Sequence, residues 1–541
     1  MATQVDVIIA GTGFGGSIAA WRLAELYHAA GVDPKNIVLL ERGQRFGHTD
    51  FKQSMSITNL SKSYVLTQGD GMQVVSANAV GGGSNLYLAA SIRSPHETFE
   101  RRDRRPGDGP DRRMWPKQIS RKTLDPFYAR VERGLRVERP SWNQVSKSGG
   151  LWAATLAAAG HTCDRVPLAI SEERCVNAKW CHTGCIFGAK NSLITNYLAA
   201  AEGLGVVVKP GVEVQNVKAG PGGGYRYTVV TNNGDFDAKL VILATGAMGD
   251  APILMRSKND LSSLSAQVGQ NLGSNGDHVA AAEYDPTKVR SVLGLPGYGE
   301  FYKGKPITTM SYDWWVNRRD HKFDGTRFTL QEIFLSSLTN FLYDDGRKPE
   351  GDPSWWGLQK KQAIGTWNNH IELLAMVEDT SDGAFYEQPP SGDAIRPNGG
   401  PVTVGLFTYK LSEQSQNVRE AANAAMKKVL ERRGLAKFMA LTETPGAYSA
   451  HPLGGCRMAA SADLGVVDHH GAVFGYEGLY CFGSSIIPTS LGVNPSLTIA
   501  AVAERNAIAL AKRGHDFGLP KPPAGFKHHV PPQTIGKRVI P

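Results

Sequence analysis

The sequence predicts an α/β fold: a Rossmann-type dinucleotide-binding domain assembled from separate chain segments, with an inserted α+β domain built on an antiparallel sheet. Two observations predict the first part. A strand, glycine turn, helix and strand open the chain, and buried-strand patterns return mid-chain and near the end. A third observation predicts the insertion, because the runs between residues 300 and 440 are aromatic-rich and alternate like antiparallel strands.

The nucleotide-binding pieces follow a regular order. Residues 5–10 (VDVIIA) are short, apolar and β-branched, as in a buried parallel strand. Residues 17–26 predict a helix and residues 36–41 a second strand. Similar strands are predicted at 240–244 and 479–482, and a long helix begins at Pro495 and ends near Lys512.

Glycines between the first strand and helix form the pattern G-x-G-x-x-G, at Gly11, Gly13 and Gly16. Such a turn lets backbone approach a pyrophosphate, which the N-terminus of the next helix attracts. Glu41 ends the second strand, where a carboxylate accepts hydrogen bonds from ribose hydroxyls. The full context predicts a dinucleotide site, although the glycines alone do not separate FAD from NAD.

Composition narrows the class of protein. The net charge is +9, and residues 100–122 and 512–541 supply much of it within Pro- and Gly-rich stretches. These stretches carry no aromatic interleaving or nucleic-acid motif, so we expect solvated segments and no nucleic-acid partner. No apolar run is long enough to predict an integral membrane segment. The start MATQVDVIIAG enters a strand at once, which predicts a cytoplasmic protein and leaves export with a partner open.

Three motifs together resemble the glucose-methanol-choline (GMC) oxidoreductases, in particular their cholesterol oxidase-like branch. They are the opening unit, residues 80–85 (VGGGSN), and residues 451–506 with HPLGGCRM and LYCFGSSIIPTSLGVNPSLTIAAVAERN. The resemblance implies the GMC fold with extended FAD. It divides the chain into an FAD-binding domain (1–100, 205–295 and 445–515), a substrate-binding cap with a cysteine segment (101–204 and 296–444), and a basic C-terminal tail (516–541).

The resemblance also assigns cofactor-binding residues. On the ADP half and the neighbouring loop these are Gly11, Gly13, Phe14, Gly16, Glu41, Gly82, Gly83, Ser84 and Asn85. Val214 matches a strand that contacts adenine. The residues near the flavin ring and ribityl chain are Gly483, Asn494, Pro495 and Leu497. Ala244 is a further candidate.

His451 and Asn494 are the predicted catalytic residues, because the resemblance places both beside flavin N5. Removing a hydride from a carbinol carbon requires a group that accepts the hydroxyl proton, and His titrates nearest neutral pH. Two positions depart from the family: Trp367 falls where a glutamate base is expected, and Gly483-Ser484-Ser485 replaces Asp-Gly-Ser. Glu372 is the candidate replacement base, with His451 acting alone as the alternative.

Cys175, Cys181 and Cys185 give the spacing C-x5-C-x3-C, from which thiolates converge on an iron–sulfur cluster. This spacing resembles that of FAD-glucose dehydrogenase catalytic subunits, which implies candidate 3Fe-4S ligands. Reduced, partly buried thiols are the alternative.

The sequence therefore predicts an FAD-dependent oxidoreductase that oxidises the CH–OH group of a bulky, apolar, sterol-like or other alcohol by hydride transfer to flavin N5. Oxygen or an electron-transfer partner is the expected acceptor. Two alternatives stay open: an electron-transferring sugar or polyol dehydrogenase with an iron–sulfur cluster, and a flavin-binding protein with little catalysis. Five tryptophans are candidates for an apolar pocket or for plain core: Trp314, Trp315, Trp355, Trp356 and Trp367.

Overall fold

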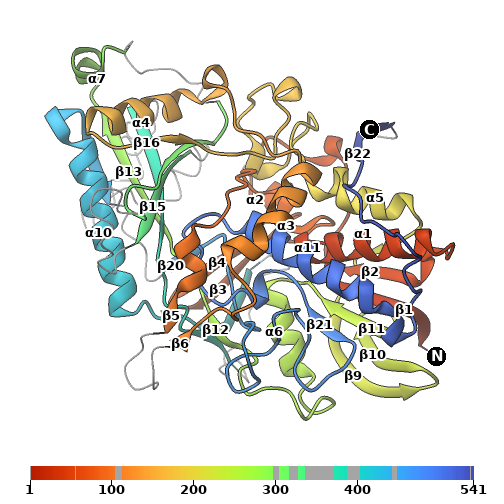
Figure 1. The fold of residues 1–541 in the computed structure, drawn as a ribbon. Coiled ribbons are helices and arrows are strands. Elements are labelled where there is room, and N and C mark those ends of the chain that lie inside the picture. The colour runs from red at the N-terminus through yellow and green to blue at the C-terminus, as the bar shows by residue number, and fades with distance from the viewer. Residues whose placement is uncertain are drawn as a thin grey trace.

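The computed structural model describes residues 2–54, 56–103, 112–295, 304–315, 327–334, 369–386, 402–440, 447–535 and 538–540. Trp355, Trp356 and Trp367 lie outside these ranges. Three large sheets organise the described chain (Figure 1). Smaller elements are α2 (Ile57–Leu60), the ladder of β5 (Arg102–Asp103) with β6 (Arg112–Arg113), and that of β22 (Gln533–Ile535) with β23 (Arg538–Ile540).

The first sheet forms the nucleotide-binding half, in the order β8-β2-β1-β11-β10-β9, with β21 beside β11. Its members are β1 (Thr3–Ala10), β2 (Ile37–Glu41), β8 (Val207–Pro210), β9 (Val214–Gly222), β10 (Tyr225–Thr231), β11 (Phe236–Leu243) and β21 (Leu479–Cys481). Strands β8, β2, β1, β11 and β21 run parallel, and β9 and β10 are antiparallel. The predicted discontinuous Rossmann-type sheet is confirmed.

Helices from distant parts of the chain lie side by side on this sheet (Figure 1). They are α1 (Phe14–Ala29), α3 (Arg121–Gly134), α5 (Tyr197–Gly203) and α11 (Ser496–Arg513). Apolar side chains of β1, α1 and α11 join one buried cluster. Burying this apolar surface provides the main force that holds the separate segments together.

A second sheet connects the two halves, in the order β12-β17-β18-β3-β4-β20. Its members are β3 (Tyr64–Asp70), β4 (Met72–Ala77), β12 (Gln270–Leu272), β17 (Gly383–Phe385), β18 (Val402–Thr408) and β20 (Ala447–Ser449). Strand β20 matters most for function, because the chain leaves it directly into His451.

The third sheet is antiparallel throughout, as predicted, and runs β19-β13-β16-β15-β14-β7. Its members are β7 (Asp164–Arg165), β13 (Asp277–Tyr284), β14 (Ile307–Ser311), β15 (Phe328–Ile333), β16 (His370–Val377) and β19 (Ala436–Ala440). Helices α4 (Lys147–Ala158) and α10 (Glu413–Leu430) cover one face, which we call the outer face. Leu374 and Met376 belong instead to the main core. We call their side the inner face.

The predicted division into domains stays a prediction, but some elements lie across it. Strand β13, inside the predicted FAD segment 205–295, pairs with β16 and β19 of the third sheet. Helix α7 (Pro286–Leu293) follows it, while α6 (Ala247–Arg256) packs against β9 of the first sheet. Helices α3 and α5, inside the predicted cap segment, pack on α11 and α1. Strand order is decided by long-range pairing, which local sequence does not reveal.

The C-terminal segment differs from the expected solvated tail. Buried Arg22 donates to the backbone oxygen of His529, and Glu25 accepts from the backbone N–H of the same residue at 2.6 Å. Arg22 also pairs with buried Glu504 at 2.5 Å. These contacts anchor residues 528–529 across α1 and α11, although many side chains between 521 and 530 remain exposed.

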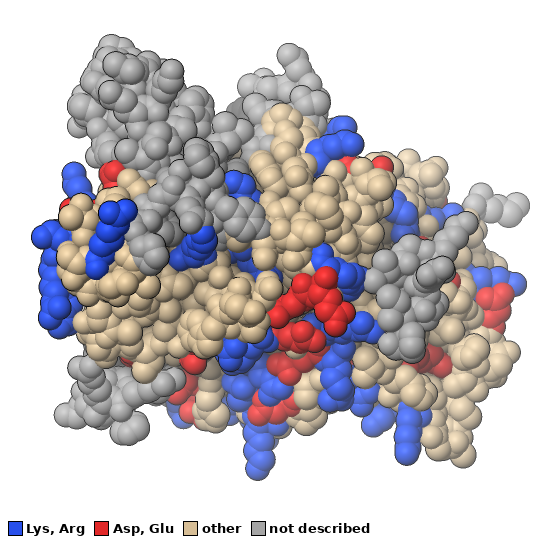
Figure 2. Space-filling model, turned by 90° about the horizontal axis from the view of Figure 1, so that it is seen from above, with Lys and Arg blue, Asp and Glu red and all other residues tan. Residues whose placement is uncertain are grey.

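Basic and acidic side chains are mixed on the face drawn in Figure 2, with blue and red groups interspersed across its lower half. In the described part of the chain, no helix is both long and apolar enough to cross a membrane.

Candidate active site

The glycine turn between β1 and α1 is tightly constrained at two of its three predicted positions. Gly11 has φ +92°, and a Cβ there would lie 2.5 Å from the backbone oxygen of Ala244. A Cβ on Gly16 would lie 2.0 Å from the backbone oxygen of Gly11. Gly13, in contrast, faces open space with no atom within 4 Å of its would-be Cβ. Thus two glycines close the turn and the third leaves room above the N-terminus of α1.

Thr12 joins this turn to the second predicted loop. Its hydroxyl donates to Glu41 Oε2 at 2.6 Å and accepts from the Gly81 N–H at 2.9 Å. A Cβ on Gly82 would lie 2.8 Å from Gly13 Cα, so the two loops touch. Glu41 also accepts from the N–H groups of Thr12 and Gly43, and its burial raises the pKa of the carboxyl. Glu41 therefore organises the turn as well as lying at the predicted ribose position.

The other predicted cofactor residues fall around the same region. Ser84 accepts from the Leu193 N–H at 3.0 Å, and Phe14 packs edge-on against Tyr87. Val214 begins β9, Ala244 directly follows β11, Pro495 caps α11, and Leu497 is buried in its first turn. The predicted residues therefore come from separate parts of the chain, most of them at strand or helix ends and in the loops beside them.

These residues fit an extended dinucleotide. Open space lies beside Gly13, Gly83 and Gly483, where an added Cβ would meet nothing within 4 Å. Two buried amide oxygens, Oδ1 of Asn85 and Oδ1 of Asn494, make no hydrogen bond in the described chain. Helix N-termini at α1 and α11 offer unpaired backbone N–H groups. FAD needs space close to the backbone for its pyrophosphate, hydrogen-bond partners and helix N-termini. The described residues offer all three.

His451 is held by a carboxylate that sequence reasoning missed. Its Nδ1 lies 2.7 Å and 2.9 Å from the two oxygens of Asp277. The carboxylate also accepts from the Ala450 N–H at 2.9 Å, and Asp277 is 4% exposed. Because a carboxylate accepts, the ring proton sits on Nδ1 and the Nε2 lone pair is free to accept a proton.

Asn494 lies on the open side of that ring. Its Nδ2 is 3.5 Å from His451 Nε2, a long contact consistent with N–H pointing at the ring lone pair. Its Oδ1 is one of the orphan acceptors. The structure thus brings together the two predicted catalytic residues.

One short segment, residues 274–277, positions both of them. Ser274 accepts through its backbone oxygen from Ser449, beside His451. The Asn275 amide donates to the Val493 oxygen at 3.0 Å and accepts from the Leu491 N–H at 2.7 Å, which clamps the loop before Asn494. A Cβ on Gly276 would lie 1.9 Å from the Val377 oxygen. The sequence SNGD at a strand start was the available signal, but it also matches an ordinary turn.

Glu372 does not join this pair directly. It lies on β16 opposite Ala281 and Ile333, whereas Asp277 is opposite Met376. Met376 is four positions after Glu372 on the same strand face, a rise of about 13 Å. Glu372 therefore lies on the inner face, away from the residue opposite Asp277, and its role as base stays a prediction.

The two described tryptophans of the predicted pocket have different surroundings. Trp314 stacks on Phe328, with ring centroids 5.8 Å apart, within the outer-face cluster. Trp315 is buried where a Cβ on Gly492 would touch its ring, in the loop before Asn494. Only Trp315 thus borders the candidate active site.

A buried carboxyl group from another element lies beside the Gly483–Ser485 turn, where the family pattern has Asp-Gly-Ser. Ser485 donates to Asp250 on α6 at 2.5 Å, and Thr245 donates to the same carboxyl through its N–H and hydroxyl. Complete burial raises the pKa of Asp250 to about 6. A carboxyl group is therefore retained beneath the Gly483–Ser485 turn.

The cysteine segment lies next to the cofactor loop but shows no cluster. Lys190 donates to the backbone oxygens of Asn85, Tyr87 and Cys181 at 2.5, 3.1 and 2.6 Å, which ties the two segments together. Burial raises the pKa of Cys181 to about 12 and also raises that of Cys175, so both thiols are protonated at neutral pH. Within the described ranges, no group of three or more His, Cys, Asp or Glu is arranged to hold a metal. The predicted 3Fe-4S cluster thus finds no support.

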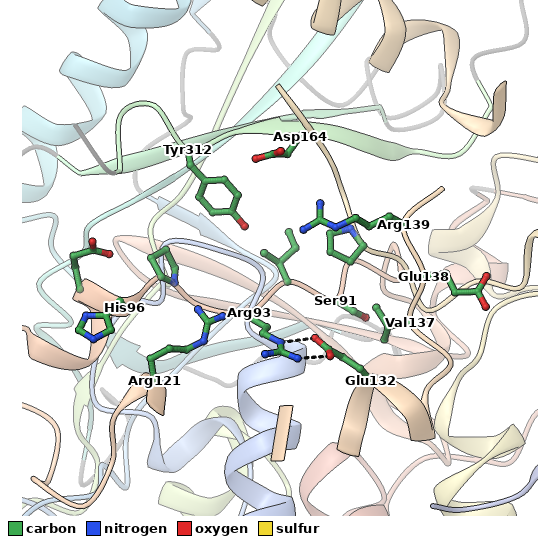
Figure 3. A pocket seen from close by; sticks show the side chains of 14 residues that line it. Ser91, Arg93, His96, Arg121, Glu132, Val137, Glu138, Arg139, Asp164 and Tyr312 are labelled. Carbon is green, nitrogen blue, oxygen red and sulfur yellow. Dashed lines mark hydrogen bonds and ion pairs between the residues drawn. The ribbon is translucent and has the colours of Figure 1, made fainter. Parts of the chain in front are cut away.

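A pocket of 610 Å³ opens where residues 91–97 meet Asp164 and Tyr312 (Figure 3). Arg93 and Glu132 face each other in its wall through two bonds of 2.6 Å. None of the predicted site residues lines this pocket. It is therefore a cavity separate from the His451 site.

Comparisons with known proteins agree with this geometry. A sequence model of the family described as FAD dependent oxidoreductase matches residues 6–302, more than half of the chain. The chain therefore belongs to the FAD dependent oxidoreductases. A second model, GMC oxidoreductase, matches residues 405–503. The predicted resemblance to the GMC oxidoreductases and their cholesterol oxidase-like branch is thereby confirmed.

Three similar curated proteins are named as oxidases. A cholesterol oxidase of Mycobacterium tuberculosis is 26% identical over 98% of this chain and 96% of its own. A cholesterol oxidase of Acinetobacter baumannii is 25% identical over 92% and 93%. A long-chain-alcohol oxidase of Arabidopsis thaliana is 25% identical over 92% of this chain and 66% of its own.

Solved structures share the fold. A formate oxidase of Aspergillus oryzae superposes with a TM-score of 0.61 at 14% identity, covering 95% of this chain and 99% of the other. A pyridoxine 4-oxidase gives a TM-score of 0.57 at 16% identity, covering 93% and 98%. At such identities the likeness concerns architecture alone.

Proposed function

We propose that this protein oxidises the CH–OH group of a bulky, largely apolar alcohol. The observation that carries the proposal is the His451 ring, with Nδ1 held by Asp277 and Nε2 turned toward Asn494. Bound FAD would supply the two-electron acceptor, taking the hydride at N5. The protein residues bind and orient the alcohol and accept its hydroxyl proton.

His451 acts as the base. Asp277 keeps the ring proton on Nδ1 and stabilises the imidazolium that forms when Nε2 accepts the hydroxyl proton. Asn494 lies close enough to hold the substrate oxygen through its amide without adding charge. The long 3.5 Å contact to His451 is readily exchanged for one to a bound hydroxyl.

The apolar part of the substrate is inferred from the inner face of the third sheet. Ile307, Met310, Ile333, Leu374 and Met376 are buried there and belong to the main core. Such side chains favour a hydrocarbon body over a sugar, because a sugar's hydroxyls would lose water without gaining partners. The curated relatives named for cholesterol and long-chain alcohols support the same substrate class.

The test is anaerobic reduction of the FAD-loaded protein by a panel of sterols, long-chain alcohols and sugars. We expect sterols or long-chain alcohols to bleach the flavin, and His451→Ala to slow bleaching at least about 100-fold. Peroxide formation in air identifies oxygen as the acceptor. Failure of every alcohol would leave a flavin-binding protein with little catalysis, and reduction by sugars alone would contradict the apolar assignment.

A further inference from the structure

Gln331 is a buried polar residue that the reaction described above does not use. It lies on β15, its side chain has no exposed surface, and neither amide atom makes a hydrogen bond in the described part of the chain. Unpaired amides of this kind are rare in folded proteins because burial removes their water without replacing it. A partner supplied by a ligand would account for the residue.

Strand register places Gln331 close to the catalytic residues. Thr329 and Asp277 are both opposite Met376, so they flank one row across the inner face. The Thr329 hydroxyl donates to the Gly492 oxygen at 2.6 Å, in the loop that leads to Asn494. Gln331 is two residues further along the same strand face, a rise of about 7 Å.

The protein offers Gln331 only apolar neighbours across the strands. It is opposite Leu374 on β16 and Met310 on β14, and Ile333 follows on the same face. A carboxamide in this setting adds a donor and an acceptor beside apolar side chains, on a face that also carries Glu372 opposite Ile333. Gln331 lies two residues beyond Thr329 on this face, where a polar side chain contributes to substrate specificity.

We propose that Gln331 recognises a second polar group on the substrate, an oxygen that lies further along the inner face than the reacting carbinol. The inference rests on the proposed function and narrows its substrate class to apolar alcohols that carry a further hydroxyl or keto group. The Gln331 N–H groups donate to that oxygen, and its Oε1 accepts when the group is a hydroxyl.

The experiment compares matched pairs of alcohols, each pair alike in size and differing only in the second oxygen. In the FAD-loaded protein, we expect the doubly functional member to reduce the flavin with a kcat/KM about tenfold higher. Gln331→Met keeps the volume and removes the amide, so it should abolish this preference, mainly through KM. Gln331→Asn, which withdraws the amide by one methylene, should lose part of it.

A matched control removes another unpartnered buried group away from the site. Trp152 Nε1 on α4 is buried and unpaired in the outer-face cluster, and Trp152→Phe should leave the preference intact. Equilibrium binding of the corresponding ketone pairs, followed by flavin absorbance, gives a measure that needs no turnover. Equal binding of both pair members by wild type, or an unchanged ratio in Gln331→Met, overturns the inference. Absence of reduction by any alcohol, with discrimination retained in binding, overturns the proposed function alone.

Discussion

The glycine turn at residues 11–16 and the histidine end of the site are built in opposite ways. The turn is mostly local: Gly16 closes it against the Gly11 oxygen, and Ala244, which follows the neighbouring strand β11, is the one distant contact. The histidine end joins three distant segments, because Asp277 holds His451 and Asn275 holds the loop before Asn494. Close backbone contacts hold the glycine turn, whereas hydrogen bonds from Asp277 and Asn275 hold the histidine end. The two regions should therefore fail differently when altered.

The largest effect is expected at Gly16. Gly16→Ala puts a Cβ 2.0 Å from a backbone oxygen that cannot move away, so the folded state should lose more than about 4 kcal/mol. Gly13→Ala is the matched control, since its φ of −69° suits alanine and its surroundings are open. It should fold within about 0.5 kcal/mol of wild type and lose FAD affinity at least about tenfold. Chemical denaturation and FAD titration measure both, and equal stability of the two variants would contradict this account.

The next largest effect is expected at Asp277. Asp277→Asn turns an acceptor into a donor toward Nδ1, which moves the ring proton to Nε2 and removes the base. Flavin reduction should slow by about 100-fold or more while FAD content is unchanged. Asp379→Asn is the control: Asp379 accepts from the Ser274 N–H at 2.9 Å and helps hold the same segment without touching His451. If both variants slow reduction equally, Asp277 acts through segment stability alone.

Asp250 should link stability to pH. Its pKa is raised from 3.8 to about 6 by burial, so the unfolded carboxyl ionises at lower pH than the folded one. Its contribution to stability is complete below the unfolded pKa and is lost as pH rises through about 6, up to about 3 kcal/mol. Asp250→Asn has no such loss, so its melting temperature should gain on wild type between about pH 4 and pH 7. A constant difference across that range would argue against a raised pKa.

The smallest effect is expected at Glu372. Glu372 lies a rise of about 13 Å along β16 from the residue opposite Asp277, and Asp277 alone holds His451 Nδ1, so we expect Glu372→Gln to change flavin reduction less than about fivefold. Stopped-flow reduction under anaerobic conditions measures this. A loss of about 100-fold would instead identify Glu372 as the base that accepts the hydroxyl proton, in place of His451.

The sequence predicted more of the glycine turn than of the histidine end of the site. Gly11, Gly16 and Glu41 lie within one βαβ unit, and the structure brings them together as expected. The His451–Asn494 pair was predicted through the family resemblance, because each residue lies in a short motif that matches the family. Asp277 was missed because its contact with His451 spans 174 positions and depends on where β13 enters the third sheet.

Gln331 and Asp250 illustrate the same limit. On sequence alone Gln331 is one polar residue in an alternating strand, and only its burial without a partner makes it notable. Asp250 accepts a hydrogen bond from Ser485, 235 positions later, a contact visible only when α6 and the Gly483–Ser485 turn are seen together. The cysteine spacing shows the limit from another side: spacing says nothing about burial, and the 3Fe-4S cluster stays a prediction without support from the described residues.

Strand β1 has one sheet neighbour, β2, close by in the chain, but its other neighbour, β11, follows only more than 200 positions later. Val5 on β1 pairs with Ala238, β21 adds to the same sheet much later, and α1 waits for α11 before its apolar side is covered. During translation this half must therefore persist with an open sheet edge, which invites aggregation and chaperone binding. Loading of FAD is accordingly a late event in the life of the nascent chain, and slower synthesis at low temperature should raise the yield of yellow protein.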